Sequence, residues 1–268
     1  MIDMIIWSRD RAMQCELLLR SAAVMLPALN KTTVVVKASN KDFNKGYEIL
    51  ESMKYPGVEF VDETNFKKDI VSILLASRAD YILGNSDDNV FINNIDLDKI
   101  KIDDDTLAFS LRLGRQVGFC EPSQMPLVLP IFVEDGDVLK WNWELCDRRG
   151  CWGLPRPCDS SVYRKKDLVK ILQSITFKNP GTMEDGLNSY SGDKRPFMKS
   201  FRQSKIVNIC NNRVQETSQC RHGEISAMEL NEKFLKGLVI DTKNIYHTDY
   251  TQCHVELPYE YVKNTTIR

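Results

Sequence analysis

The stretch "YILGNSDDNVF", residues 81–91, sets two adjacent carboxylates, Asp87 and Asp88, between two apolar runs. An apolar run that stops at a cluster of Ser, Asp and Asn is typical of a buried strand ending in a tight turn. Two interpretations of the turn stay open at this point. Asp and Asn are common turn residues, so the pair can simply reverse the chain. Alternatively, the pair holds a divalent cation, which offsets the repulsion between neighbouring carboxylates.

The residues before this stretch alternate between strand and helix patterns. The predicted order is strand 1–8, helix 12–26, strand 32–39, helix 41–54, strand 58–63 and helix 65–77. This alternation predicts an α/β protein with a mostly parallel central sheet and helices on both faces. Because ligands bind at the carboxyl ends of such strands, the loops 8–11 and 87–89 are predicted to share one edge of the sheet.

The second half of the chain has a less regular pattern. A strand is predicted at 106–114, and an irregular stretch rich in Trp, Cys, Pro and Arg follows from about 115 to 160. The remaining predicted elements are helices 165–175, 179–188 and 226–240 and strands 204–212 and 254–263. Since no repeat or obvious linker separates the two parts, a single domain over residues 1–268 is expected.

Composition excludes several classes of protein. The 268 residues carry a formal net charge of −1, which gives no electrostatic indication of a nucleic-acid partner. No run of about 18 apolar residues is present, so no integral membrane segment is expected. The first residues are too short and too acidic for a signal peptide, and a cytoplasmic location, free or peripheral at a membrane, is expected. Nothing in the sequence indicates an oligomeric state.

Eight cysteines raise the question of a metal centre. Cys146, Cys151 and Cys158, with His222, form one conceivable zinc site, although their spacings are poor for it. Reduced, partly buried thiols are the expected state of these cysteines in a chain of this length without a secretion signal.

Several motifs, in order along nearly the whole chain, resemble those of a known enzyme class. They are "SRDR" (8–11), "SDD" (86–88), "FSLRLG" (109–114), "CWGLPRPCDSSVYRKKDL" (151–168), "NPGTMED" (179–185) and "VNICNNRVQETSQCRHG" (207–223). Together they resemble a nucleotide-sugar-dependent glycosyltransferase of the GT-A fold, of the small bacterial and large-virus surface-glycan type. The resemblance implies a Rossmann-like fold with a nucleotide-binding half, residues 1–105. An acceptor-binding half with a C-terminal closing segment, residues 106–268, would complete it.

This resemblance implies a hexosyltransferase-like activity in polysaccharide biosynthesis. A sugar would move from a nucleoside diphosphate sugar, such as a UDP-sugar, to a glycan or lipid-linked acceptor. Mn²⁺ or Mg²⁺ at the acidic pair would neutralise the diphosphate leaving group. The metal motif of this class is Asp-x-Asp, and position 86 is Ser here. Which carboxylate binds metal therefore stays open, with Asp88 the first choice as metal ligand and Asp87 expected to contact the ribose or a bridging water.

Further metal and nucleotide contacts follow from the same resemblance. A ligand from the C-terminal part is expected to complete the metal site, and His222 is preferred to His254 by a small margin. The nucleotide and its phosphates would be bound by Ser8, Arg9, Arg11, Lys37, Asp87 and Arg213, with help from Arg221.

The acceptor side would lie in the irregular segment of residues 141–163. Trp152 is the candidate to stack on a sugar ring, and Asp159 the candidate to bind its hydroxyl groups. An inverting enzyme would also need a general base, for which Glu184, Asp185 and Asp147 are the candidates.

Two rival functions remain. A sugar nucleotidyltransferase shares the parallel sheet and the acidic metal site, but it usually carries a Gly-rich loop after the first strand, which "SRDRAMQ" lacks. A non-catalytic carbohydrate-binding protein is the other rival. Nucleotide binding that depends on Mn²⁺ or Mg²⁺ would separate the catalytic readings from this one.

Overall fold

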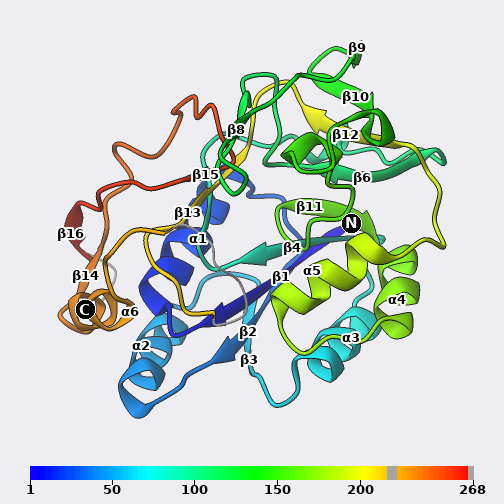
Figure 1. The fold of residues 1–268 in the computed structure, drawn as a ribbon. Helices are drawn as coiled ribbons and strands as arrows, with labels where there is room; N and C mark the ends of the chain where they lie inside the picture. Colours follow the sequence, from blue (N-terminus) through cyan, green and yellow to red (C-terminus); the bar gives the residue numbers. More distant parts are fainter. Residues whose placement is uncertain (216–221, 265–268) are drawn as a thin grey trace.

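The computed structural model describes residues 1–215 and 222–264, and its central feature is a sheet of nine strands (Figure 1). The strand order is β3-β2-β1-β4-β11-β6-β12-β10-β9. The strands are β1 (Ile2–Arg9), β2 (Lys31–Lys37), β3 (Val58–Asp62), β4 (Tyr81–Ser86), β6 (Thr106–Ser110), β9 (Val133–Asp135), β10 (Val138–Asn142), β11 (Ser161–Arg164) and β12 (Phe197–Phe201).

Most strands of this sheet run in one direction. The strands β3, β2, β1 and β4 pair in parallel, and β6 pairs in parallel with β12. Only β11 and β10 run against the others. The predicted fold class, an α/β protein with a mostly parallel central sheet, is therefore confirmed.

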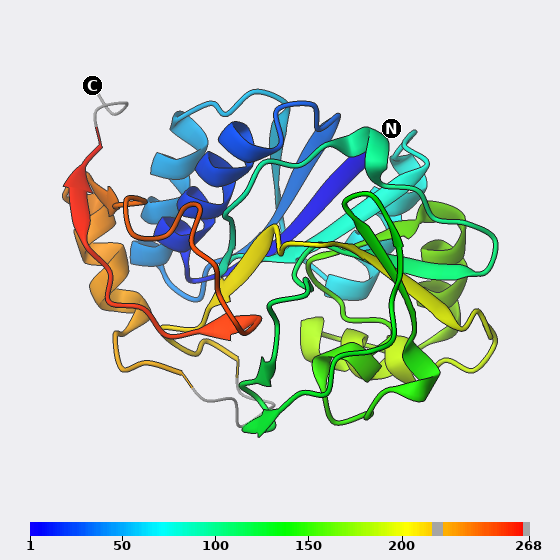
Figure 2. The ribbon, with the colours of Figure 1, turned by 90° about the horizontal axis from the view of Figure 1, so that it is seen from above.

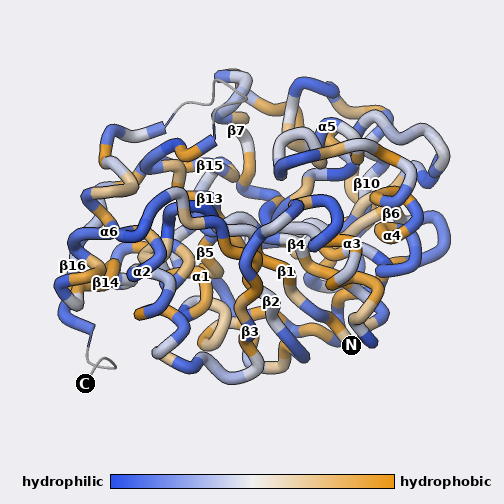
Figure 3. The backbone as a smooth tube through the Cα atoms, turned by 90° about the horizontal axis from the view of Figure 1, so that it is seen from below, coloured by the Kyte–Doolittle hydropathy of each residue, from blue (hydrophilic) through white to orange (hydrophobic). Residues whose placement is uncertain are grey.

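Helices cover both faces of the sheet because β1 is apolar on both sides. Met4 and Ile6 pack into one hydrophobic core, while Ile5 and Trp7 pack into the other. The first core is closed by α1 (Ala12–Met25), α2 (Lys41–Ser52) and α6 (Ala227–Leu235), and the second by α3 (Phe66–Ala76), α4 (Lys165–Ser174) and α5 (Pro180–Ser189). Figure 3 shows hydrophobic residues concentrated in the central strands and hydrophilic ones in outer loops.

Smaller elements complete the chain. They are β5 (Asn89–Phe91), β7 (Phe119–Cys120), β8 (Met125–Pro126), β13 (Ile206–Ile209), β14 (Leu238–Ile240), β15 (His254–Val255) and β16 (Tyr261–Lys263), with short helices η1 (Leu97–Lys99), η2 (Trp143–Leu145) and η3 (Cys151–Gly153). The strand β13 lies between β5 and β15, which places Asn208 opposite Asn89, beside the acidic turn. In Figure 2 the C-terminal segment with α6, β14 and β16 lies beside the helices of the N-terminal half.

The second half differs most from its prediction. The irregular stretch contains the hairpin β9–β10, which extends the main sheet, and the strands β11 and β12 were not predicted. The predicted helix 226–240 ends at Leu235, because Gly237 adopts a φ of 77° that reverses the chain into β14. The predicted strand 254–263 is interrupted, since only its two ends, β15 and β16, form ladders.

Within the described part of the chain, no helix combines the length and the apolar character needed to cross a bilayer.

Candidate functional site

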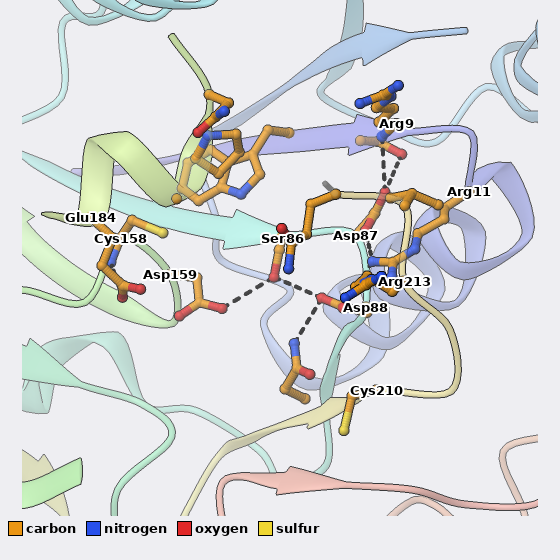
Figure 4. A pocket seen from close by; sticks show the side chains of 18 of the residues that line it. Arg9, Arg11, Ser86, Asp87, Asp88, Cys158, Asp159, Glu184, Cys210 and Arg213 are labelled. Carbon is orange, nitrogen blue, oxygen red and sulfur yellow. Dashed lines mark hydrogen bonds and ion pairs between the residues drawn. The ribbon is translucent and has the colours of Figure 1, made fainter. Parts of the chain in front are cut away.

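A cavity of about 490 Å³ lies at the carboxyl ends of β1 and β4 (Figure 4). The two strands are parallel neighbours with Trp7 opposite Ser86, so the loops that follow them meet at one edge of the sheet, as predicted. Most of the residues singled out in the sequence line this cavity, namely Ser8, Arg9, Arg11, Lys37, Asp87, Asp88, Asp159, Glu184, Arg213 and His222.

The acidic pair is bridged by Arg11. One guanidinium nitrogen, Nη1, lies 3.0 Å from Oδ1 of Asp87 and 2.9 Å from Oδ2 of Asp88. Burial acts to lower the pKa of Arg11, but the two carboxylates raise it overall, so the guanidinium stays charged. The repulsion between neighbouring carboxylates is therefore relieved first by a cation of the chain itself.

Asp87 is the buried member of the pair. Its Oδ2 accepts hydrogen bonds from Oγ of Ser8 at 2.9 Å and from the backbone N–H of Arg9 at 3.1 Å. The side chain is only 4% exposed, and burial raises its pKa to about 6 against the opposing effect of Arg11. Since both oxygens already accept hydrogen bonds, Asp87 holds the loop after β1 against β4.

Asp88 is the better exposed member. Its Oδ1 accepts a hydrogen bond from Nδ2 of Asn208 at 2.7 Å and lies 2.8 Å from Oγ of Ser86. The same Oγ lies 3.1 Å from Oδ2 of Asp159. Because a hydroxyl donates one proton, Ser86 serves either carboxylate at one time and links Asp88 to Asp159, as Figure 4 shows.

The acidic pair fits a metal ion only as a shared ligand. Among residues 1–215 and 222–264, no three His, Cys, Asp or Glu side chains gather closely enough to hold a metal ion by themselves. Mg²⁺ is commonly held by one or two carboxylates together with substrate phosphates, and Mn²⁺ takes similar oxygen ligands. Asp88 lines the cavity and is the more exposed of the two, at 13% against 4% for Asp87, so it fits a cation held jointly with a bound diphosphate.

A second group of charges forms another wall of the cavity. Arg112, fully buried, approaches Oδ1 of Asp159 to 3.3 Å, and Glu184 accepts a hydrogen bond at 3.1 Å from the backbone N–H of Cys158. Burial and the nearby Asp159 raise the pKa of Glu184, while Arg112 opposes the shift. A carboxylate with a raised pKa beside an open cavity is suited to accept a proton.

Positive side chains lie around the rest of the cavity. Arg9, Arg213 and Lys178 line it, and Nζ of Lys37 pairs with Glu63 at 2.7 Å. His222 also lines it and bonds through Nδ1 to the carbonyl of Gly223 at 2.7 Å. Such a set of cations suits an anionic ligand of the size of a diphosphate.

Three predicted residues lie elsewhere. Trp152 is 1% exposed and packs its ring against Trp141, with centroids 4.9 Å apart, so its face is not available to a sugar. Asp147 points to solvent and pairs with Arg149 at 2.7 Å, away from the residues that line the cavity. Asp185 is exposed on α5, facing away from the cavity that its neighbour lines. Arg221 lies outside the described residues.

Other residues of the site were not predicted as site residues. Asn208 reaches Asp88 from β13, and Arg112 reaches Asp159 from the end of β6. His254, weighed only as a second choice, lines the cavity, and burial together with Arg112 lowers its pKa to about 4. These residues reach the site through pairings between strands that are distant in sequence. The one signal in the sequence was that Arg112 lies within the "FSLRLG" motif.

The mostly parallel sheet and the cavity at its strand ends fit the GT-A type of fold that the motifs imply. In sequence the chain is similar to the bifunctional glycosyltransferase pgtA of Dictyostelium discoideum, with 24% identity over 235 residues. The match covers 78% of this chain but 30% of that protein, so the chain spans less than a third of the relative's length. The resemblance to glycosyltransferases stated from the motifs is thereby confirmed. No family model matches the chain.

Solved structures with a similar fold are more distant. A galactosyltransferase LgtC, solved in complex with donor and acceptor sugar analogues, has a TM-score of 0.36 and 10% identity, covering 69% of this chain and 70% of that one. A 4-diphosphocytidyl-2C-methyl-D-erythritol synthase from Anaerococcus prevotii has a TM-score of 0.42 and 11% identity, covering 78% and 89%.

Proposed function

We propose that the protein is a glycosyltransferase that moves one sugar from a nucleoside diphosphate sugar to a glycan or lipid-linked acceptor. The observation that carries the proposal is that one cavity contains Asp88, a set of cations for an anionic ligand, and the carboxylate Glu184 on another wall. Supporting it is the sequence similarity to a curated glycosyltransferase. The donor would be bound mainly by residues 1–105 and the acceptor mainly by residues 106–268.

Mn²⁺ or Mg²⁺ bound at Asp88 would supply positive charge to the diphosphate as the bond to the sugar breaks. The phosphates would be bound from the other side by Arg9, Arg213 and Lys37. The two arginines offer a bidentate geometry to phosphate oxygens, and Lys37 adds a positive charge. Asp87 would act indirectly, because its hydrogen bonds to Ser8 and Arg9 hold the loop that faces the phosphates.

Glu184 is the proposed general base. It would accept the proton of the acceptor hydroxyl as that oxygen attacks the sugar, which is the chemistry of an inverting transfer. Asp159 would hold hydroxyl groups of a bound sugar, since Arg112 and Ser86 fix its carboxylate at the cavity wall. His222 would contact the diphosphate from the closing segment.

Calorimetric titration of UDP and of GDP, with Mn²⁺ and with EDTA, tests this proposal. We expect one of the two nucleotides to bind in a metal-dependent manner, and Asp88→Asn to weaken that binding at least about tenfold. Asp147→Asn is the matched control, because this acid is exposed and does not line the cavity. No binding of either nucleotide would overturn the proposal. Preference for UTP or GTP would instead indicate a nucleotidyltransferase.

A further inference from the structure

Arg11 has three partners at the cavity, namely Asp87, Asp88 and the backbone carbonyl of Asn212. Its Nη1 contacts Asp87 and Asp88 at 3.0 and 2.9 Å, and its Nη2 donates to the backbone carbonyl of Asn212 at 2.5 Å. The side chain is 8% exposed. The guanidinium therefore occupies the space between the two carboxylates and is fixed there from the opposite side by the segment after β13.

This arrangement disfavours a divalent cation at the acidic pair by itself. A cation at about 2.1 Å from a carboxylate oxygen of Asp88 would lie close to the guanidinium, and the two positive charges would repel in a poorly solvated place. Asp87, Asp88 and Arg11 carry a combined charge of only −1. Among the residues that the structure describes, no three His, Cys, Asp or Glu side chains lie together as ligands for a metal ion. A metal ion alone would gain too little attraction to give up its water.

A bound diphosphate changes this balance. Its oxygens bring two or more negative charges and additional metal ligands next to Asp88, so the cation gains both attraction and coordination. Arg11 does not have to leave, because Asp87 and the carbonyl of Asn212 still hold it when Asp88 turns toward the metal.

We propose that Arg11 is an internal counterion of the acidic pair that makes divalent-cation binding conditional on a bound nucleoside diphosphate. The inference rests on the diphosphate site of the proposed function. It assigns Arg11 to the metal selectivity of the site rather than to direct phosphate binding, which the sequence analysis had expected. Removing its charge would turn the acidic pair into a cation site that works without nucleotide.

Mn²⁺ binding followed by electron paramagnetic resonance tests the inference without any activity assay. For the wild-type chain we expect Mn²⁺ alone to bind at least about tenfold more weakly than Mn²⁺ in the presence of UDP or GDP. Arg11→Met should strengthen binding of Mn²⁺ alone about tenfold or more, and Arg11→Met combined with Asp88→Asn should abolish the gain. Arg20→Met is the matched control, because this α1 arginine pairs with Glu16 and does not line the cavity.

The outcomes separate the two proposals. Tight binding of Mn²⁺ alone to the wild type, or no gain in folded Arg11→Met, overturns the counterion role and leaves the glycosyltransferase proposal standing. UDP or GDP binding with the same affinity in the presence and in the absence of Mn²⁺ also overturns the counterion role. Failure of both nucleotides to bind at all overturns the proposed function. Circular dichroism checks folding, and if Arg11→Met does not fold, the two wild-type measurements still decide the conditional binding.

Discussion

The backbone N–H of Cys158 donates a hydrogen bond to Oε1 of Glu184 at 3.1 Å and so ties helix α5 to the segment that leads into β11. Asp159, the next residue, is held by Arg112 and Ser86. Glu184 and Asp159, the two carboxylates on this wall of the cavity, are thus positioned by backbone and buried partners. A rigidly placed carboxylate is what a general base requires, because proton transfer depends on its geometry.

Replacing Glu184 by Gln should remove catalysis while preserving nucleotide binding. Gln keeps an oxygen that can accept the hydrogen bond from Cys158 but cannot take a proton from an acceptor hydroxyl. Turnover of the donor and acceptor identified by screening should fall about 100- to 1,000-fold, in the range of general-base catalysis. Because burial raises the pKa of Glu184, the acid limb of the pH–rate profile should lie above the range of an ordinary Glu.

Asp185→Asn is the control for this experiment, since Asp185 neighbours Glu184 but is exposed. Its turnover should stay close to that of the wild type. Equal losses in the two variants, or full activity of Glu184→Gln, would exclude Glu184 as the base.

The first half of the fold could be predicted because its signals are local. Each of β1 to β4 is a short apolar run followed by a polar loop, and the parallel order brings the loops 8–11 and 87–89 together without further information. The second half could not be predicted in this way. Its strands pair with partners distant in sequence: β11 pairs with β4 and β6, which brings Arg112 to Asp159, and β13 pairs with β5, which brings Asn208 to Asp88.

Trp152 shows where residue type misled the prediction. An aromatic residue in an irregular segment indicates sugar stacking only if its ring is exposed. Here Nε1 of Trp152 donates to the carbonyl of Val117 at 3.2 Å, and its own carbonyl accepts from Nε1 of Trp141 at 3.1 Å. Both indoles are therefore satisfied inside the core, and sequence alone does not report that burial.

Trp152→Ala should consequently act on stability. Loss of a fully buried indole and of two ring contacts should lower the free energy of unfolding by about 3–5 kcal/mol, measured by urea denaturation. Trp152→Phe, which retains a ring, should cost less. Nucleotide affinity of the folded fraction should not change. If Trp152→Ala instead keeps the stability of the wild type but no longer binds an acceptor, Trp152 stacks on a sugar ring as the sequence analysis predicted.

Arg213→Ala should weaken nucleotide binding if this arginine faces the phosphates. A charge-assisted contact to phosphate is worth about 1.5–3 kcal/mol, so affinity for the preferred nucleotide should fall about tenfold or more. The salt dependence of binding should also decrease, because one ionic contact is lost. Arg149→Ala is the control, as this residue is 76% exposed and pairs with Asp147 outside the cavity. Equal affinities of wild type and Arg213→Ala would remove Arg213 from the phosphate site.

His254 should make the protein sensitive to mild acid. Burial, with Arg112 nearby, lowers its folded-state pKa to about 4, below the value of about 6.5 for an unfolded histidine. The unfolded chain therefore binds this proton first, and the stability associated with neutral His254 is present above pH 6.5 and is lost as the pH falls toward 4. Its Nδ1 is buried without a hydrogen-bond partner, and the nearby Asp159, Asp88 and Glu121 offset only part of the effect of burial and Arg112. Urea denaturation at pH 7 and at pH 4.5 gives the free energy of unfolding at each pH. The decrease between the two pH values should be about 2 kcal/mol smaller in His254→Gln than in the wild type.

His222→Gln is the control, because His222 lines the same cavity but is exposed, and its decrease should match that of the wild type. A decrease in His254→Gln equal to that of the wild type would show that His254 is not the residue that titrates.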